Sequence, residues 1–205
     1  MRLALAIALF CASAAAIAEP IGFEGDTVGQ PPASWTCGAT GRGAPKWTVE
    51  ADPSVPGGKA LRQSGSATFP WCVKGNATLT DGWVEAKFKP LSGKEDQAGG
   101  VVWRWKDGDN YYVARANALE NNVSLYYTAR GIRKTLKYVD APVAGGQWHT
   151  LRVEFAGTKI GVSLDGKRYI DFDDSHIAGS GAVGVWTKAD SVTAFDEFGY
   201  GSGPR

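Results

Sequence analysis

Two arginines on one predicted hairpin are the side chains of this chain best suited to ligand chemistry. Arg104 and Arg115 belong to runs that flank a turn at residues 107–110. Alternation across that turn predicts that they are diagonal neighbours on one face of a sheet. Two guanidinium groups so close repel each other unless acceptor oxygens lie between them. Glu85 or Glu120 would supply these internally, whereas a uronate or an array of sugar hydroxyls would supply them as a ligand.

The segment after Arg115 adds the amide and carboxylate groups that bind sugar hydroxyls. Asn117, Glu120, Asn121 and Asn122 follow within seven residues. Asn117 shares the strand parity of Arg115. We therefore predict that Arg104, Arg115 and Asn117 line one concave, glycan-binding sheet surface.

Aromatic residues of the same region have two possible roles. Trp103, Trp105 and Tyr112 fall on the opposite face of the hairpin, where they either stack on sugar rings or pack in the core. Core packing is favoured for the two tryptophans, because aromatic side chains dominate buried contacts. We also predict ligand contacts from Tyr111 and Trp186.

Charged residues near the end of the chain alternate with Trp186. Lys188 and Asp190 follow it at two-residue spacing, which puts all three on one face of an extended segment. Lys188 and Asp190 either reach the rim of a binding site or form a surface ion pair. We include Lys188 among the predicted ligand contacts.

These side chains need a scaffold of strands. The chain contains 27 Gly and 10 Pro, and short β-branched and aromatic runs alternate with turn residues, as is typical of an all-β sandwich. We predict about a dozen strands, forming a two-sheet antiparallel jelly roll with both termini in one sheet. The expected runs are 47–50, 59–63, 82–89, 100–105, 111–117, 123–128, 135–139, 149–155, 159–164, 167–172, 182–187 and 193–200.

The first residues have the pattern of a signal peptide. Arg2 precedes a short apolar run, and Ala16-Ile17-Ala18 forms an A-x-A cleavage site. We assign residues 1–18 to the signal peptide and residues 19–205 to one domain, periplasmic or secreted. A membrane anchor is the alternative, but the apolar run is shorter than the roughly 20 residues of a membrane span.

Cleavage would leave two cysteines, Cys37 and Cys72. An isolated pair in an oxidising compartment predicts a disulfide. In the chain-entropy model its loop contributes about 3–4 kcal/mol of stability. The mature chain would be close to neutral, since only one of the 22 basic residues lies in the leader and 21 acidic residues remain. That balance argues against nucleic acid and against electrostatic binding to anionic lipid.

Several segments together carry a family resemblance: Phe23–Pro32, Gly100–Trp105, Asn110–Asn117, Gln147–Glu154 and Val183–Asp196. Over most of the mature chain, the sequence resembles the concanavalin A-like lectin/glucanase superfamily. Within it, the chain is similar to secreted bacterial domains described as 3-keto-disaccharide hydrolase-like. The resemblance implies a jelly roll and a carbohydrate partner. The superfamily hosts lectins, hydrolases, lyases and adhesion modules, so fold alone does not choose among them.

The strand motif of family 16 glucanases, E-x-D-x-x-E, is absent. Glu24 and Asp26 begin the pattern, but Gly29 stands where the second Glu belongs. If the chain is nevertheless a hydrolase of the kind that the resemblance implies, Glu120, Asp190 or His149 are the acid/base candidates. A structural role is favoured for His149.

A structural Ca²⁺ is a further possibility. Glu24 follows Phe23 near the start and Asp196 follows Phe195 near the end, and sugar-binding β-sandwich modules with similar terminal motifs often hold Ca²⁺ between them. Two carboxylates with loop carbonyls would supply the oxygen ligands that Ca²⁺ prefers. A strand-capping role for Asp196, with Glu24 paired to a Lys, is slightly favoured over the metal.

Three functions remain open. The leading hypothesis is carbohydrate recognition at the cell envelope. The alternatives are hydrolysis of a modified disaccharide such as a 3-keto-glycoside, and a non-catalytic structural or adhesion module.

Overall fold

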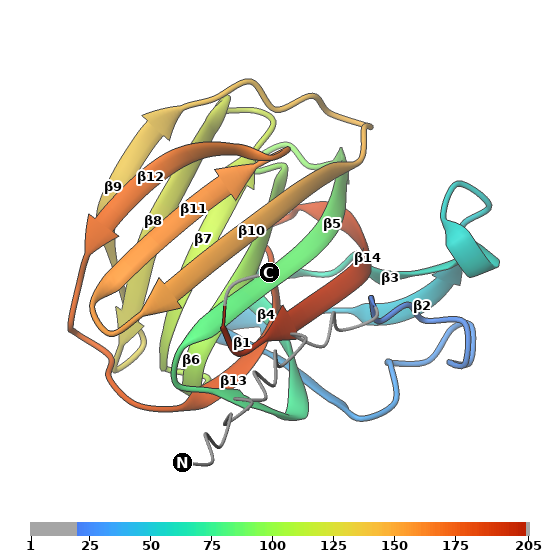
Figure 1. Cartoon of the computed structure of the whole chain (residues 1–205). Helices are drawn as coiled ribbons and strands as arrows, with labels where there is room; N and C mark the ends of the chain where they lie inside the picture. Colours follow the sequence, from blue (N-terminus) through green and yellow to red (C-terminus); the bar gives the residue numbers. More distant parts are fainter. Residues whose placement is uncertain (1–19, 204–205) are drawn as a thin grey trace, which may run out of the picture.

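The computed structural model describes residues 20–203, and these are organised almost entirely as β-structure (Figure 1). The predicted signal peptide, residues 1–18, lies outside the described residues. A single 3-10 turn, Pro56–Gly58, interrupts the strands. The strands are β1 Trp35–Ala44, β2 Trp47–Ala51, β3 Lys59–Gln63, β4 Ser66–Leu79, β5 Gly82–Ser92, β6 Ala98–Asp107, β7 Asn110–Asn117, β8 Asn122–Ala129, β9 Ile132–Asp140, β10 His149–Ala156, β11 Lys159–Leu164, β12 Lys167–Asp173, β13 Gly181–Trp186 and β14 Val192–Gly201.

The strands form two antiparallel sheets of seven strands each, packed face to face. The first sheet, called the concave sheet below, has the order β1-β4-β13-β6-β7-β8-β9. The second, called the covering sheet, has the order β12-β11-β10-β5-β14-β3-β2. Figure 1 shows the covering strands β10–β12 in front of β6–β9. The predicted all-β two-sheet sandwich is confirmed.

The core lies between the sheets, and strand alternation builds it. In β5, Val84, Ala86 and Phe88 point inward and are buried. From the concave sheet, Trp103 stacks on Tyr112, with ring centres 5.3 Å apart, and lies 5.9 Å from Phe155 of the covering sheet. Core packing, rather than sugar stacking, is therefore the role of Trp103 and Tyr112.

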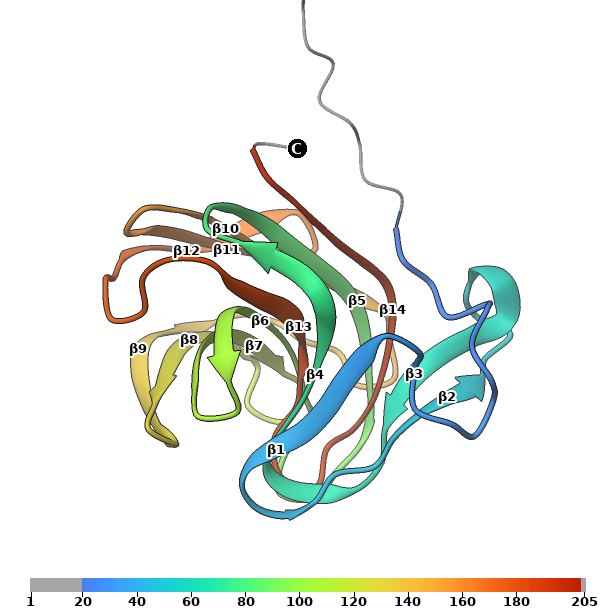
Figure 2. The same ribbon diagram turned by 90° about the horizontal axis from the view of Figure 1, so that it is seen from below.

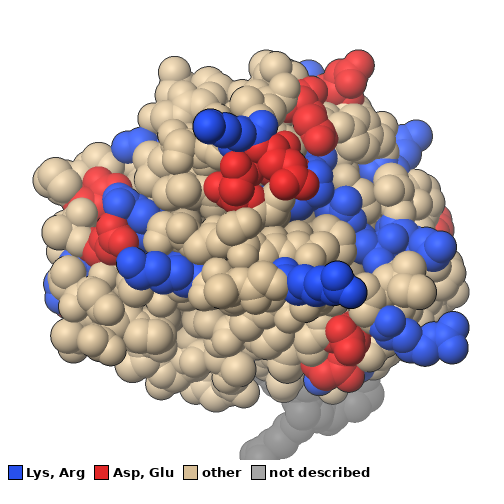
Figure 3. All heavy atoms as spheres, turned by 180° about the vertical axis from the view of Figure 1, so that it is seen from behind, with Lys and Arg blue, Asp and Glu red and all other residues tan. Residues whose placement is uncertain are grey.

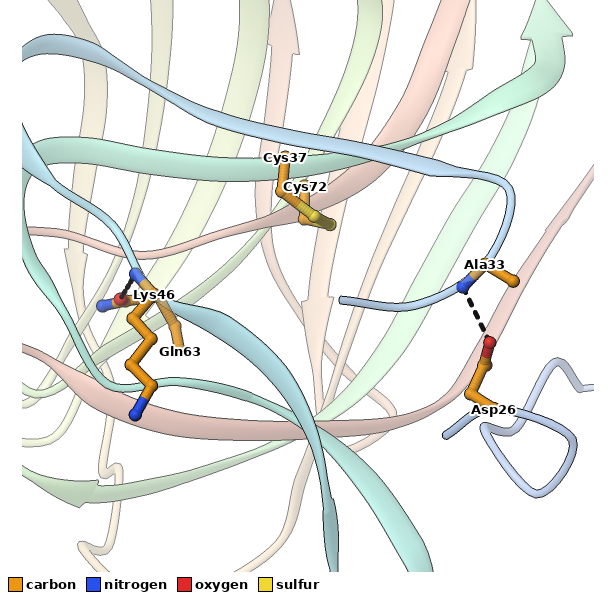
Figure 4. Close-up of a disulfide and its surroundings, with 6 residues drawn as sticks. All are labelled: Asp26, Ala33, Cys37, Lys46, Gln63 and Cys72. Atoms are coloured by element: carbon orange, nitrogen blue, oxygen red, sulfur yellow. Dashed lines mark hydrogen bonds between the residues drawn. A yellow bond between two sulfur atoms is a disulfide. The ribbon is translucent and has the colours of Figure 1, made fainter. Parts of the chain in front are cut away.

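Two strands, β1 and β4, were not predicted. Strand β1 is rich in Gly and Ala, and β4 contains Pro70; these residues are depleted in strands. A covalent link holds the two strands together, because Cys37 and Cys72 face each other in register and form a disulfide, with Cα atoms 4.0 Å apart (Figure 4). The predicted disulfide is confirmed.

The first described residues pair with the last strand. Ile21 N–H donates to the Phe198 carbonyl at 2.7 Å, and Phe198 N–H donates back at 3.0 Å. This isolated bridge joins the start of the described residues to β14, whereas the first full strand, β1, belongs to the other sheet.

Candidate functional site

The concave sheet curls so strongly that its distant strands touch across its outer face (Figure 2). Thr40 Oγ1 of β1 lies 2.8 Å from Tyr111 Oη of β7. The guanidinium carbon of Arg133 in β9 lies 4.4 Å from the ring centre of Phe69 in β4. In a flat sheet β4 and β9 would be about 24 Å apart, at about 4.8 Å per strand. Side chains from both edges therefore meet across the curled outer face, and we call this curled face the trough.

Arg115 lies in this trough between two carboxylates. Its side chain is almost fully buried, at 1% exposure. Its Nη1 donates to Asp96 Oδ1 at 3.3 Å, and its Nη2 donates to Glu120 and, at 3.1 Å, to Asn122 Oδ1. Buried charges are tolerated when they are paired and hydrogen-bonded in this way. We call Asp96, Arg115, Asn117, Glu120, Asn122, Tyr138 and Lys188 the polar network.

Asp96 connects the network to a fixed loop. Its carboxylate also accepts hydrogen bonds from Asn117 Nδ2 and Lys188 Nζ. The loop that carries Asp96 is held by Asp190, which accepts backbone N–H bonds from residues 94–96 at 2.7–3.1 Å. The structure thus brings together Arg115 and Asn117 of β7 with Lys188, which follows β13, and Asp190 positions the loop that carries Asp96.

Glu120 and Tyr138 carry the network to the solvent. The Glu120 side chain is 36% exposed, and it accepts hydrogen bonds from Tyr138 Oη at 2.5 Å and Asn122 Nδ2 at 2.8 Å. Partial burial raises the pKa of the Glu120 carboxyl, but bonds from Tyr138, Asn122 and Arg115 outweigh that effect and lower it to about 2. Burial and the bond to Glu120 raise the pKa of Tyr138 to about 12. At neutral pH Glu120 is therefore a fixed, ionised acceptor.

Aromatic side chains fill the rest of the trough. Trp186 and Tyr111 are fully buried, so these two predicted ligand contacts form its floor. Burial raises the pKa of Tyr111, whose hydroxyl bonds to Thr40. Phe69, which is partly exposed, stacks at 5.7 Å on Trp186. Phe69 and Trp105 are partly exposed rings of this cluster.

The predicted pairing of Arg104 with Arg115 is wrong. Strand β6 contains extra residues between Trp103 and Asp107, and Arg104 adopts φ 46° in this bulge, which breaks the alternation that the prediction assumed. Arg104 instead donates to the carbonyls of Thr80, Ile177 and Gly157 and lies 5.6 Å from the Phe155 ring. It joins loops at one end of the sandwich, away from the trough. Glu85 faces Arg152 on the covering sheet at 3.5 Å.

Six residues of the trough were missed: Thr40, Phe69, Asp96, Tyr126, Arg133 and Tyr138. Tyr126 shares its strand face with Asn122 and Ser124 of β8, so simple alternation would have found it. A register shift between Leu125 and Tyr126 obscures which β9 residues face the trough. Asp96 lies in a loop, where periodicity gives no signal.

Comparison with known proteins identifies the architecture. No family model matches the chain, and no curated protein matches it. Among solved structures, it is similar to the carbohydrate-binding module CBM66 of Bacillus subtilis (22% identity, TM-score 0.67, covering 82% of this chain and 96% of that one). It is also similar to a β-glucanase of Bacillus licheniformis (14%, TM-score 0.58, 91% and 97%) and to the cellulose-induced protein Cip1 (13%, TM-score 0.59, 83% and 92%). At these identities the shared property is the fold. The chain has the concanavalin-like jelly-roll fold.

Within this concanavalin-like fold, the three predicted acid/base residues do not form one constellation. Glu120 is on the trough rim and Asp190 lies behind the loop at residues 94–96. His149 belongs to β10 of the covering sheet, where its Nδ1 faces Asp165 Oδ2 at 2.7 Å and its Nε2 faces the Ala144 carbonyl at 3.0 Å. Both ring nitrogens are occupied, which fits the structural role favoured for His149.

The two ends of the concanavalin-like domain offer a fit to the predicted Ca²⁺. Asp196 is 1% exposed, and neither of its carboxylate oxygens has a hydrogen-bond partner. Burial raises the pKa of Asp196 to about 6, and the negative charges of Glu24 and Glu197 also raise it. The Glu197 backbone amide and Lys87 lower the pKa, but by less. A buried, unpartnered carboxylate beside a second one is a hard-oxygen donor set suited to Ca²⁺. Between residues 20 and 203 no cluster of three or more His, Cys, Asp or Glu suited to a metal occurs, so main-chain oxygens would complete the shell.

A separate groove of about 790 Å³ lies on the outer side of β10–β12. Its charged side chains are matched with each other: Glu154 pairs with Arg168 at 2.5 Å, and Lys159 pairs with Asp173 at 2.7 Å. Polar groups that converge on a ligand are what distinguish a binding site from a hollow. We therefore place the candidate site in the trough rather than in this groove.

Proposed function

We propose that this chain is a non-catalytic carbohydrate-recognition domain that binds a glycan in the trough of the concave sheet. The observation that carries the proposal is Arg115 held between Asp96 and Glu120, in a network that reaches the solvent at Glu120, Tyr138 and Lys188. Fixed planar acceptors and donors of this kind bind adjacent sugar hydroxyls in pairs. The partly exposed Phe69 ring beside them supplies an apolar surface.

Recognition fits the trough better than hydrolysis does. A glycosidase needs one carboxyl group that carries a proton near neutral pH. Glu120, the solvent-accessible carboxylate of the network, has its pKa lowered to about 2. Two structural neighbours, a carbohydrate-binding module and a β-glucanase, are compatible with both functions.

Export to the periplasm or the exterior belongs to the same proposal. The leader-like residues 1–18 and the Cys37–Cys72 disulfide support it. Within residues 20–203 no helix has the length and apolar character to cross a bilayer.

A glycan array, run beside a reducing-sugar release assay on every glycan bound, tests the proposal. Glu120→Gln keeps the size of the side chain but removes the ionised acceptor, and we expect it to weaken binding about tenfold or more. Glu154→Gln is the matched control, because Glu154 is also a partly exposed, ion-paired carboxylate but lies on the covering sheet. Equal affinities for Glu120→Gln and wild type would contradict the proposed site. Release of reducing ends, abolished by Glu120→Gln, would make the chain a hydrolase, the alternative function.

A further inference from the structure

Arg133 is the second guanidinium group of the trough. Its guanidinium carbon lies 4.2 Å from the Tyr126 ring centre and 4.4 Å from that of Phe69. Arg115 approaches the same Tyr126 ring at 5.7 Å. Two arginines therefore flank one tyrosine, with Arg133 supplied by the edge strand β9.

These two arginines differ in their partners. Arg115 has Asp96 and Glu120, whereas Arg133 makes no ion pair and no hydrogen bond with any residue between 20 and 203. Its Nη1 is buried without a partner. Nε and Nη2 have no acceptor among residues 20–203 either, and they are not among the fully buried atoms without a partner. These two atoms form the side-on edge of the guanidinium, which binds a carboxylate through two parallel hydrogen bonds.

The charge around Arg133 is unbalanced. The trough holds three cations, Arg115, Arg133 and Lys188, against two carboxylates, Asp96 and Glu120. Burial and the nearby charge of Arg115 lower the pKa of Arg133.

The surroundings of Arg133 are also basic. The β8–β9 turn and β9 carry Arg130, Lys134 and Lys137 besides Arg133, and Asp140 is the acidic residue of that strand. Figure 3 shows the molecule from behind, with Lys and Arg gathered on the half that holds β8 and β9. An anion approaching the trough from that side meets a favourable field.

From the open edge of Arg133 and the surplus positive charge around it, we infer that the glycan bound in the trough is acidic, with an anionic group of one sugar seated on Arg133. This inference rests on the proposed carbohydrate recognition and narrows its ligand class. The anionic group is a carboxylate, as in uronic acids, or a sulfate ester, since both offer oxygen pairs to a guanidinium edge. The neutral part of the sugar then lies toward Glu120, Asn122 and Lys188.

Pairs of acidic and neutral polysaccharides with the same backbone test whether the charge of the ligand, rather than the identity of its sugar, determines binding. Binding to polygalacturonate and alginate is compared by calorimetry with binding to the carboxyl-reduced, neutral forms of the same polymers. Dextran sulfate and dextran form the sulfate arm. We expect one acidic polymer to bind about tenfold to a hundredfold more tightly than its neutral counterpart, and the arm in which this occurs identifies the anion.

Two charge-matched variants locate the effect. Arg133→Gln should abolish the preference for the acidic form, and Arg133→Lys should recover only part of it because an ammonium lacks the two-donor edge. Lys134→Gln removes the same charge from the exposed neighbour, which pairs with Tyr127 on the other face of the sheet, and should retain the preference. Thermal melts check that each variant is folded.

The inference and the function that it refines fail in different ways. Equal binding of acidic and neutral polymers, abolished in both by Glu120→Gln, would overturn the inference and leave carbohydrate recognition standing. Equal losses in Arg133→Gln and Lys134→Gln would also overturn it, since they would indicate diffuse attraction rather than a seated anion. Binding of no acidic or neutral polymer would overturn both.

Discussion

Replacing Asp196 with Asn is expected to stabilise the protein in the absence of metal. The buried carboxylate has no hydrogen-bond partner, and its pKa is raised from 3.8 to about 6. At about 1.4 kcal/mol per pKa unit, ionising Asp196 in the folded state costs about 3 kcal/mol. For a domain of this size that corresponds to a rise in Tm of roughly 5–10 °C for Asp196→Asn at pH 7.5 in chelator.

The pH dependence follows from the direction of the shift. Because the folded pKa lies above the unfolded one, the stability linked to Asp196 is fully present below about pH 4. It is lost as the pH rises through about 6. The Tm difference between Asp196→Asn and wild type should therefore be small at pH 4, grow between pH 4 and 6, and stay constant above that range.

Calcium reverses the comparison. If Ca²⁺ binds Asp196 and Glu24, wild type gains stability by mass action and Asp196→Asn does not. The gain is about 4.1 kcal/mol at a thousand times the Kd, which exceeds the cost of about 3 kcal/mol. Asp190→Asn is the control of opposite sign, since Asp190 accepts three backbone bonds that lower its pKa; this variant should be destabilised. A lower Tm of Asp196→Asn in chelator would refute the unpaired-carboxylate reasoning, and equal wild-type melting temperatures with Ca²⁺ and chelator would rule out the metal.

Three other outcomes are expected. The Cys37–Cys72 disulfide closes a loop with a sequence separation of 35. Its reduction should lower the free energy of unfolding by about 4 kcal/mol, which melts with and without reductant would measure. Labelling of two free thiols in the native, unreduced protein would contradict the bond. Arg104→Ala should lower the free energy of unfolding by about 3 kcal/mol, because three carbonyls lose the hydrogen bonds that Arg104 donates. Glycan affinity below the melting temperature should not change. A selective loss of affinity would place Arg104 at the site. The stability difference between wild type and Glu120→Gln should persist at neutral pH and shrink as the pH falls from about 4.5 toward 2. The reason is that the pKa of Glu120 is lowered in the folded protein, so its carboxylate is protonated only in acid. A difference that does not change with pH would show that the carboxylate charge is not involved.

The sequence predicted the sandwich better than the site, for a physical reason. Alternation in runs such as Gly82–Lys89 depends on neighbouring residues alone, so this strand was predicted correctly; its alternate residues Val84, Ala86 and Phe88 are the buried ones. The Arg104 prediction failed because a bulge in β6 breaks that parity after Trp103. Nothing in the local pattern marks how far a sheet will curl, and this curl is what brings Arg133 of β9 to Phe69 of β4.

The trough combines a rigid hydrogen-bonded network with one cation, Arg133, that has no anionic partner among the described residues. These two parts would act differently on a ligand. Arg115, Asp96 and Asn117 are buried and bonded to each other, so binding would order little there and lose little conformational entropy. Arg133 is held between two rings, yet it has no acceptor among the described residues. Any sugar with suitably spaced hydroxyls would satisfy the rigid network at Glu120, whereas only an anionic sugar would also satisfy Arg133. We therefore expect the network to determine the affinity that many glycans share, and Arg133 to determine the preference for acidic glycans over neutral ones. In a complex with a neutral glycan the charged Arg133 would stay unpaired, which costs more free energy than a missing neutral hydrogen bond.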